Sequence, residues 1–181
     1  MILDLRIAAP ADIPALHALI EASVRGLAGA DYQREQINGA LGTLLGLDTQ
    51  LVEDGTYLVA EARAGCARVL AGAGGWSRRK TLFGSDRAAL RENDLLDPRS
   101  DAARIRAFFV HPDFARQGVG TRILAAAEAA ARAEGFRRFE MGATLTGVPL
   151  YLARGYRELE RLEVPLANGA RLSIVRMEKS D

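Results

Sequence analysis

The chain has 181 residues, of which 49% are hydrophobic and 26% are charged, so it is long enough for one domain with a buried core. Its formal net charge of +1 excludes a general electrostatic attraction to nucleic acid or to an anionic membrane surface. The single cysteine, Cys66, excludes an intrachain disulfide and a zinc site built from several thiolates. We interpret Cys66 as a structural residue in or beside a turn.

No stretch of the chain approaches the roughly 20 consecutive apolar residues that a membrane helix needs. The N-terminus lacks a basic segment followed by a long apolar run, which a secretory signal would show. The two histidines, His17 and His111, do not belong to a cluster of Cys, His and Asp residues at the spacing of metal ligands. We therefore expect a cytoplasmic protein with no metal ion and with no membrane or nucleic-acid partner.

The N-terminal half predicts a strand, two helices and an antiparallel hairpin. Alternation of apolar and polar residues indicates strands, and apolar residues at helical spacing indicate helices. Three glycines near the end of the second hairpin strand, Gly72, Gly74 and Gly75, indicate a bulge or a close backbone neighbour. The expected elements are a strand over 3–8, a helix over 10–25, a second helix over 33–45, and hairpin strands over 56–62 and 67–76.

Residues 77–101 are polar, charged and weakly periodic, and they are too long for an ordinary connection in a compact domain. We call this segment the insertion and expect it to cover a substrate site, with a homodimer contact as the alternative. Its charges suggest that late acids hold a cationic amine and early bases hold a carboxylate on the same molecule. The bases are Arg78, Arg79 and Lys80, and the acids are Glu92, Asp94 and Asp97.

The C-terminal half predicts one β-α-β crossover followed by a hairpin that turns at Asn168-Gly169. The fold class is therefore α/β (α+β): a mixed central sheet, antiparallel at both ends with a central crossover, flanked by helices in a single domain, 1–181. The expected elements are strands over 104–110, 138–145, 156–164 and 171–179, and helices over 118–134 and 148–154.

A turn almost bare of side chains lies between the strand ending at Val110 and the next helix. The first N–H groups of a helix lack partners, and the helix dipole places partial positive charge there. Gly118 and Gly120 would let an anion approach, so the turn predicts a phosphate or pyrophosphate cradle. The alternative is a tight turn that needs glycine for packing alone. No GxxxxGK[ST] motif is present, and Ile123 replaces the third glycine of a dinucleotide site.

Two motifs around the crossover resemble the GCN5-related N-acetyltransferase (GNAT) superfamily. The first is the strand end Val110-His111-Pro112 followed by the glycines 118 and 120, although Ala115 stands where the family carries Gln or Arg. The second is the set Tyr151, Gly155 and Tyr156. The resemblance covers residues 104–158 well and the N-terminal half only through the order of its elements.

The resemblance implies a fold and a cosubstrate. Two neighbouring parallel strands, ending here at Val110 and Leu145, would separate, and acetyl-CoA would lie in the gap between them. Its pantetheine arm would bind the exposed strand backbone and its pyrophosphate would lie on the cradle. The implied binding residues are Phe108, Phe109 and Val110 on the strand, and Arg116, Gln117, Gly118, Val119, Gly120 and Thr121 in the cradle.

The resemblance also implies an amine that attacks the thioester directly, with an acid for the leaving thiolate, a base for the amine and an oxyanion donor. Tyr151 matches the acid position, with packing of a short helix as the alternative. Glu140 or a water molecule is the expected base, with an ion pair to Arg104, Arg106 or Arg138 as the alternative for Glu140. A strand N–H near Val110 is the expected oxyanion donor.

The leading function is therefore an acetyl-CoA-dependent N-acetyltransferase acting on a primary amine of a small molecule. Relatives that modify protein N-termini often carry an asparagine near the place of Leu145 and Thr146, which disfavours such a substrate. A non-catalytic acyl-CoA-binding sensor and a nucleotide-phosphate-binding protein remain as alternatives. Trp76 is either part of the core or a wall of the acceptor pocket.

Overall fold

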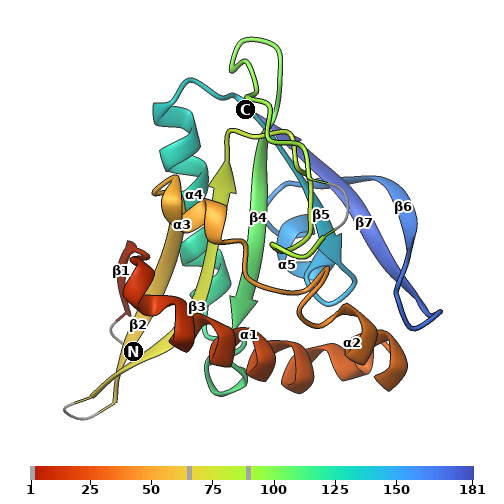
Figure 1. The fold of residues 1–181 in the computed structure, drawn as a ribbon. Coiled ribbons are helices and arrows are strands. Elements are labelled where there is room, and N and C mark those ends of the chain that lie inside the picture. Colours follow the sequence, from red (N-terminus) through yellow and green to blue (C-terminus); the bar gives the residue numbers. More distant parts are fainter. Residues whose placement is uncertain (1–2, 65–66, 89–90) are drawn as a thin grey trace.

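The computed structural model describes residues 3–64, 67–88 and 91–181 of the chain (Figure 1). Cys66, expected in a turn, lies outside these residues. The described strands form one sheet in the order β1-β2-β3-β4-β5-β7-β6. Their bounds are β1 Leu3–Ile7, β2 Tyr57–Ala64, β3 Ala67–Ser77, β4 Ala103–Val110, β5 Arg138–Thr144, β6 Arg157–Pro165 and β7 Arg171–Ser180.

The sheet is mixed, as expected. β4 and β5 pair in parallel, and the neighbouring pairs on either side of them are antiparallel. The helix α4 forms the crossover between β4 and β5. It ends shortly before Gly135, whose φ angle of 95° lies in the left-handed region. The helices are α1 Ile13–Leu27, α2 Arg34–Ala40, α3 Thr49–Glu53, α4 Val119–Ala133 and α5 Val148–Leu152, with single 3₁₀ turns at Pro10–Asp12, Ala28–Ala30 and Pro112–Phe114.

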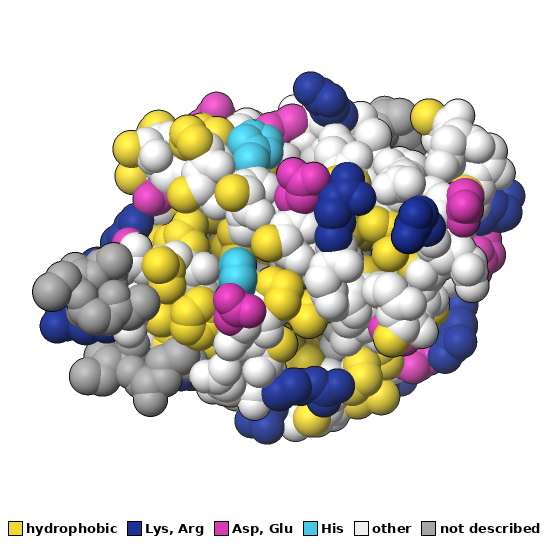
Figure 2. Space-filling model, turned by 90° about the horizontal axis from the view of Figure 1, so that it is seen from below, with side chains coloured by type: hydrophobic (Ala, Val, Ile, Leu, Met, Phe, Trp, Pro, Cys, Tyr) yellow, Lys and Arg dark blue, Asp and Glu magenta, His cyan; other side chains and the backbone are white. Residues whose placement is uncertain are grey.

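Helices cover both faces of the sheet (Figure 1). On one face, α1 and α2 pack with Tyr57, Phe109 and Ile174 in one apolar cluster. On the other face, α4 packs against two further clusters that include Phe139 and Met141. Each buried CH₂ group in these clusters contributes about 0.8 kcal/mol, so burial on both faces holds the helices against the sheet. Over the face seen in Figure 2, charges of both signs alternate with apolar side chains.

The second expected helix is shorter than the predicted 33–45, and a further short helix was missed. α2 ends at Ala40 because Leu41 has extended backbone angles and Gly42 is left-handed, with a φ of 79°. Residues 41–47 are therefore an irregular segment. The helix α3 follows it, and the Asp48 carboxylate caps its N-terminus by accepting a hydrogen bond from the Gln50 amide.

Candidate active site

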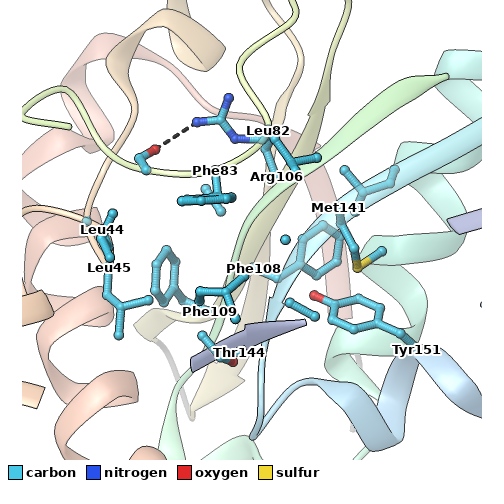
Figure 3. Close-up of a pocket in the computed structure, with 17 residues that line it drawn as sticks. Leu44, Leu45, Leu82, Phe83, Arg106, Phe108, Phe109, Met141, Thr144 and Tyr151 are labelled. Atoms are coloured by element: carbon cyan, nitrogen blue, oxygen red, sulfur yellow. Dashed lines mark hydrogen bonds between the residues drawn. The ribbon is translucent and has the colours of Figure 1, made fainter. Parts of the chain in front are cut away.

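The site begins where the two parallel strands separate. β4 and β5 pair at Ala103 with Phe139 and at Arg104 with Glu140, and no further residue pair of these two strands is hydrogen-bonded in register. Beyond Arg104, β4 therefore turns an edge of backbone groups toward an open gap. The gap holds a cavity of about 70 Å³, lined by β4, β5, α5 and two irregular segments (Figure 3). The separation of the strands matches the expected geometry.

A bulge lies in β4 at the level of this cavity. Ala107 has a φ of 55°, in the left-handed region, and Ala107 and Phe108 together oppose the single residue Gly74 of β3. The buried Tyr57 hydroxyl donates a hydrogen bond of 2.8 Å to the Ala107 carbonyl oxygen. Because a trans peptide is planar, the N–H of Phe108 on that same peptide points away from Tyr57. Tyr57 thus fixes the direction of this N–H group.

The glycines of β3 make this arrangement possible. A Cβ atom on Gly75 would lie 2.4 Å from the Thr56 oxygen and 3.0 Å from the Tyr57 ring. A Cβ atom on Gly74 would lie 2.8 Å from the Phe108 ring. The bare strand therefore lets Tyr57 reach from β2 across β3 to β4, and lets Phe108 pack closely. The expected bulge and close neighbour are both confirmed.

The structure favours a different backbone N–H group from that of Val110 as the expected oxyanion donor. The Val110 N–H donates to the Ser23 hydroxyl of α1 at 3.2 Å, so this group already has a partner. The N–H of Phe108 is the better candidate because the bulge directs it.

Tyr151 lies in α5 and lines the cavity. Its side chain is 6% exposed and packs edge-on against Phe108 and Tyr156, with ring centroids 6.2 and 5.8 Å apart. Its hydroxyl points toward the other residues around the cavity rather than into the core (Figure 3). Burial raises the pKa of this phenol above its ordinary value, so it remains protonated at neutral pH. The position suits a proton donor, and that role stays a prediction.

The predicted cradle follows β4 directly. Arg116 and Gly118 both have positive φ angles, 61° and 81°, and Gly118 forms the N-cap of α4. The first amides of a helix lack partners within it, and the described residues supply no acceptor to Val119, Gly120 or Thr121. These amides are therefore free to bind an anion, together with the exposed guanidinium of Arg116.

The two cradle glycines serve different needs. A Cβ atom on Gly118 would meet nothing within 4 Å, so glycine is favoured there by the backbone angle. A Cβ atom on Gly120 would lie 3.0 Å from Leu150, so packing also favours glycine there. Val119 is buried in the core and can offer a ligand its amide alone, and the Gln117 side chain donates to the Asp113 oxygen.

Glu140 is held in ion pairs. Its carboxylate accepts hydrogen bonds from Arg104 of β4 and from Arg176 of β7, and its side chain is 10% exposed. The ion-pair alternative for this residue is therefore what the structure shows, with Arg104 as the partner from the expected set. Both carboxylate oxygens already accept hydrogen bonds, which argues against a role as base. That role stays a prediction, and Arg176 was missed because the strand order placed β7 beside β5.

The insertion contributes to the cavity through apolar residues. Leu82, Phe83 and Gly84 line it opposite the irregular segment 41–47. The two segments are joined by hydrogen bonds from the Ser85 amide to the Thr43 oxygen, 2.9 Å, and from the Asp86 amide to the Leu47 oxygen, 3.1 Å. We call residues 41–47 and 82–87 together the roof. Figure 3 shows Phe83, Leu44 and Leu45 on the side of the cavity opposite Tyr151 and Met141.

A buried ion pair attaches the roof to β4. Arg106 is 3% exposed and contacts the Asp48 carboxylate at 2.8 Å, and it also donates to the backbone oxygens of Thr81 and Gly84. Asp48 in turn binds Arg91 of the insertion at 2.8 Å. Sequence reasoning missed this group, because Asp48 and Arg106 lie 58 residues apart and carry no local motif.

The charged residues of the insertion lie away from this cavity, and their expected use toward an acceptor stays a prediction. Each of its early bases is paired elsewhere: Arg78 with Glu134, Arg79 with Asp54, and Lys80 with Asp94. Neither these bases nor the late acids line the cavity.

Other candidates have structural positions. Trp76 belongs to the core, 3% exposed and edge-on to Phe136, and it does not line the cavity. The Tyr32 hydroxyl donates to the Ser173 oxygen and accepts from the Leu145 amide, which fixes the end of β5. His111 accepts a hydrogen bond from the Asp113 amide, as a polar residue at a strand end does. Among the described residues, no group of three His, Cys, Asp or Glu side chains could hold a metal ion.

Comparison with known proteins supports the resemblance to the GNAT superfamily. A family model described as "Acetyltransferase (GNAT) domain" matches residues 93–180, while the curated proteins give no match. The fold resembles a GCN5-related N-acetyltransferase from Rhodopseudomonas palustris, with 23% identity, a TM-score of 0.70, and coverage of 100% of this chain and 99% of that one. The resemblance to the GNAT superfamily and the expected fold are thereby confirmed. No helix of the described residues is long and apolar enough to cross a membrane.

Two further solved structures share the fold. PaiA N-acetyltransferase from Thermoplasma acidophilum, in complex with coenzyme A, is 14% identical with a TM-score of 0.66, and each chain is covered over 100% of its length. Ribosomal-protein-alanine N-acetyltransferase from Brucella melitensis is 20% identical with a TM-score of 0.63, and 98% of this chain and 99% of that one are covered. Because the identities are 14% and 20%, these neighbours show the fold alone.

Proposed function

We propose that this GNAT-superfamily chain is an acetyl-CoA-dependent N-acetyltransferase that moves an acetyl group to the primary amine of a small molecule. The observation that carries the proposal is the gap between β4 and β5, which leads directly to the bare N-terminus of α4. A long ligand with a pyrophosphate at one end and a thioester at the other fits both features. The coenzyme A complex of the structural neighbour from Thermoplasma acidophilum supports this choice.

The proposed binding residues are those implied by the sequence. The backbone of Phe108, Phe109 and Val110 forms the open edge of β4, which can pair with the amides of a pantetheine arm. The unpaired first amides of α4, those of residues 119–121, and the exposed Arg116 guanidinium would bind the pyrophosphate.

The proposed reaction forms one bond and breaks one. The neutral amine attacks the thioester carbon, the C–N bond forms, the C–S bond breaks, and the thiolate takes a proton from Tyr151. Negative charge that develops on the thioester oxygen is stabilised by the Phe108 N–H. The described lining of the cavity holds no Asp, Glu or His, so we assign removal of the amine proton to water.

The size of the cavity favours a small acceptor. The roof bounds one side of a space of about 70 Å³, which suits a small acceptor better than a protein chain. Loss of the roof contacts should therefore change acceptor kinetics and leave the affinity for acetyl-CoA intact.

Binding of acetyl-CoA, measured by calorimetry, and release of free thiol with a panel of amines test the proposal together. Gly120→Val should raise the Kd for CoA by roughly 100-fold, about 2.7 kcal/mol, because the side chain crowds Leu150 and the cradle. Gly29→Val is the matched control, since a Cβ atom there would meet nothing within 4 Å.

Each outcome separates the candidate functions. Unchanged CoA affinity in a folded Gly120→Val protein would show that the cradle is wrongly placed. CoA binding without thiol release for any amine would favour the non-catalytic sensor. Binding of ATP with no binding of CoA would favour the nucleotide-phosphate alternative.

A further inference from the structure

We infer that the acceptor is a compact apolar primary amine that carries no carboxylate and no second ammonium group. This inference names the substrate class of the proposed N-acetyltransferase site and therefore rests on the proposed function. It is carried by the side chains of the cavity wall and by the pairing of Arg106, the charged side chain among the described lining residues, with Asp48.

Most side chains of the cavity wall are apolar, while backbone groups of the strands and loops add polar surface. Its side chains come from the roof, β4, β5, β7 and α5, and the polar ones among them are Arg106, Thr144 and the Tyr151 hydroxyl. The apolar ones are Leu44, Leu45, Leu82, Phe83, Ile105, Ala107, Phe108, Phe109, Met141, Ala143 and Ile174. Such a wall gains from contact with a hydrocarbon or aromatic group at roughly 25 cal/mol per Å² of apolar surface.

The one charged side chain of the wall is not available to a substrate carboxylate. The Arg106 guanidinium binds Asp48, the Thr81 oxygen and the Gly84 oxygen, and the Asp48 carboxylate balances its charge. A carboxylate brought into the cavity would lose its water and meet no unpaired cation among the described lining residues, which disfavours its binding. Amino acids are therefore poor acceptors, in contrast to the expectation from the charges of the insertion.

The same wall assists the chemistry of an apolar amine. Transfer of an alkylammonium group into apolar surroundings lowers its pKa from the ordinary value of about 10, because burial disfavours the charged form. The attacking amine must be neutral, so desolvation supplies part of what a dedicated base would supply. An amine with a second, non-reacting ammonium group would have to bury that charge as well.

Phe83 sets how large the apolar group can be. Its ring covers Gly142 of β5 so closely that a Cβ atom on Gly142 would lie 2.6 Å from the Phe83 Cδ1 atom. A cavity of about 70 Å³ is roughly half of the 150 Å³ space that admits benzene in an engineered apolar core.

A second groove on the far side of Leu45 and Gly46 has a volume of about 290 Å³. Its lining combines the apolar Ile20, Leu41 and Leu47 with the charged Glu21, Asp86 and Arg87, so it offers less apolar surface to an acceptor than the cavity does.

The test compares amines on the intact protein with acetyl-CoA. Isoamylamine and 2-phenylethylamine represent the inferred class, and glutamate, lysine, spermidine and an alanine-terminated peptide represent charged acceptors. We expect kcat/KM for the better apolar amine to exceed that for every charged acceptor by at least tenfold. Turnover of a charged acceptor at an equal or higher kcat/KM would overturn this inference and leave the proposed function standing. Absence of thiol release with all six amines would overturn both.

A pair of variants tests the wall itself. Phe83→Ala should raise the KM for isoamylamine about tenfold and improve the ratio of 2-phenylethylamine to isoamylamine turnover, with the Kd for acetyl-CoA unchanged. Leu95→Ala is the matched control, because Leu95 lies in the same insertion, is 62% exposed and does not line the cavity. Equal amine kinetics in the two variants would show that Phe83 does not contact the acceptor and would overturn its assignment.

Discussion

The cofactor side and the acceptor side of the candidate site are built in different ways. The cofactor side is β4, the turn at Gly118 and the start of α4, which are consecutive in the chain and offer mainly backbone groups. The acceptor side is the roof, assembled from residues 41–47 and 82–87 and attached to β4 by Arg106. A backbone site tolerates many side chains around it, whereas a roof of side chains can change its substrate with one substitution.

The largest effect is expected from breaking the attachment of the roof. Asp48→Asn leaves the buried Arg106 guanidinium without its counter-charge, which typically costs about 3–5 kcal/mol of unfolding free energy. Denaturant unfolding measures this loss, and the KM for the acceptor should rise while the Kd for acetyl-CoA changes little. Asp94→Asn is the control, since its pair with Lys80 is exposed and should contribute less than about 1 kcal/mol. Equal losses in the two variants would contradict the assigned role of the buried pair.

The next effect concerns the proton donor between the two sides. Tyr151→Phe should lower kcat by roughly 100-fold, about 2.7 kcal/mol, with acetyl-CoA affinity unchanged. Since burial raises the pKa of Tyr151, the acid form persists above pH 10, and a pH profile of the intact protein should show no loss of this acid up to that pH.

Tyr156→Phe is the control for Tyr151→Phe, because it also removes a buried tyrosine hydroxyl. It removes a buried hydrogen bond to Glu128 at 2.9 Å and should lower stability by about 1–3 kcal/mol with a small effect on kcat. A kcat for Tyr151→Phe as high as that of the unmodified protein would show that the thiolate leaves without this donor.

A smaller effect is expected from the residue that orients the bulge. Tyr57→Phe frees the Ala107 carbonyl and should reduce kcat about tenfold, because the Phe108 N–H loses its fixed direction. Tyr32→Phe also removes a buried hydroxyl with two hydrogen bonds, but it lies at the end of β5. We expect both variants to lose stability and Tyr57→Phe alone to lose kcat, which steady-state kinetics at saturating acetyl-CoA would detect.

The smallest effect is expected at Glu140. Glu140→Gln should change kcat less than about threefold and lower stability modestly, because its carboxylate serves Arg104 and Arg176. Measurement of kcat against pH in the Glu140→Gln variant tests whether Glu140 acts as the general base. A loss of 100-fold or more that disappears at high pH would support the role of base.

The contrast between the two sides also explains what the sequence could predict. Gly118 and Gly120 lie between a strand and a helix, and local constraints alone place them at a helix N-terminus. The end of α2 and the short α3 were missed because Gly42 and the Asp48 cap act over one or two residues. The pairing of Arg176 with Glu140 was missed because it depends on β7 lying beside β5, which no local pattern encodes.

The same limit applied to the roof. Residues 77–101 could be predicted as a functional segment from their length and polarity, and part of them does line the cavity. The sequence pattern emphasised the charged residues of this segment, whereas its residues that line the cavity include the apolar Leu82 and Phe83. Burial of a short apolar pair inside a polar segment depends on tertiary packing, so composition alone could not show which residues line the cavity.

The short ladder between β4 and β5 has a consequence for hydrogen exchange. Two residue pairs join these strands, so the sheet consists of two well-paired parts, β1 to β4 and β5 to β7, with an interrupted seam between them. Amides along the open edge of β4 beyond Arg104 should exchange with solvent faster than those paired with β3, by a local opening that leaves both parts folded. A ligand that pairs with that edge would slow this exchange and make the two parts unfold as one.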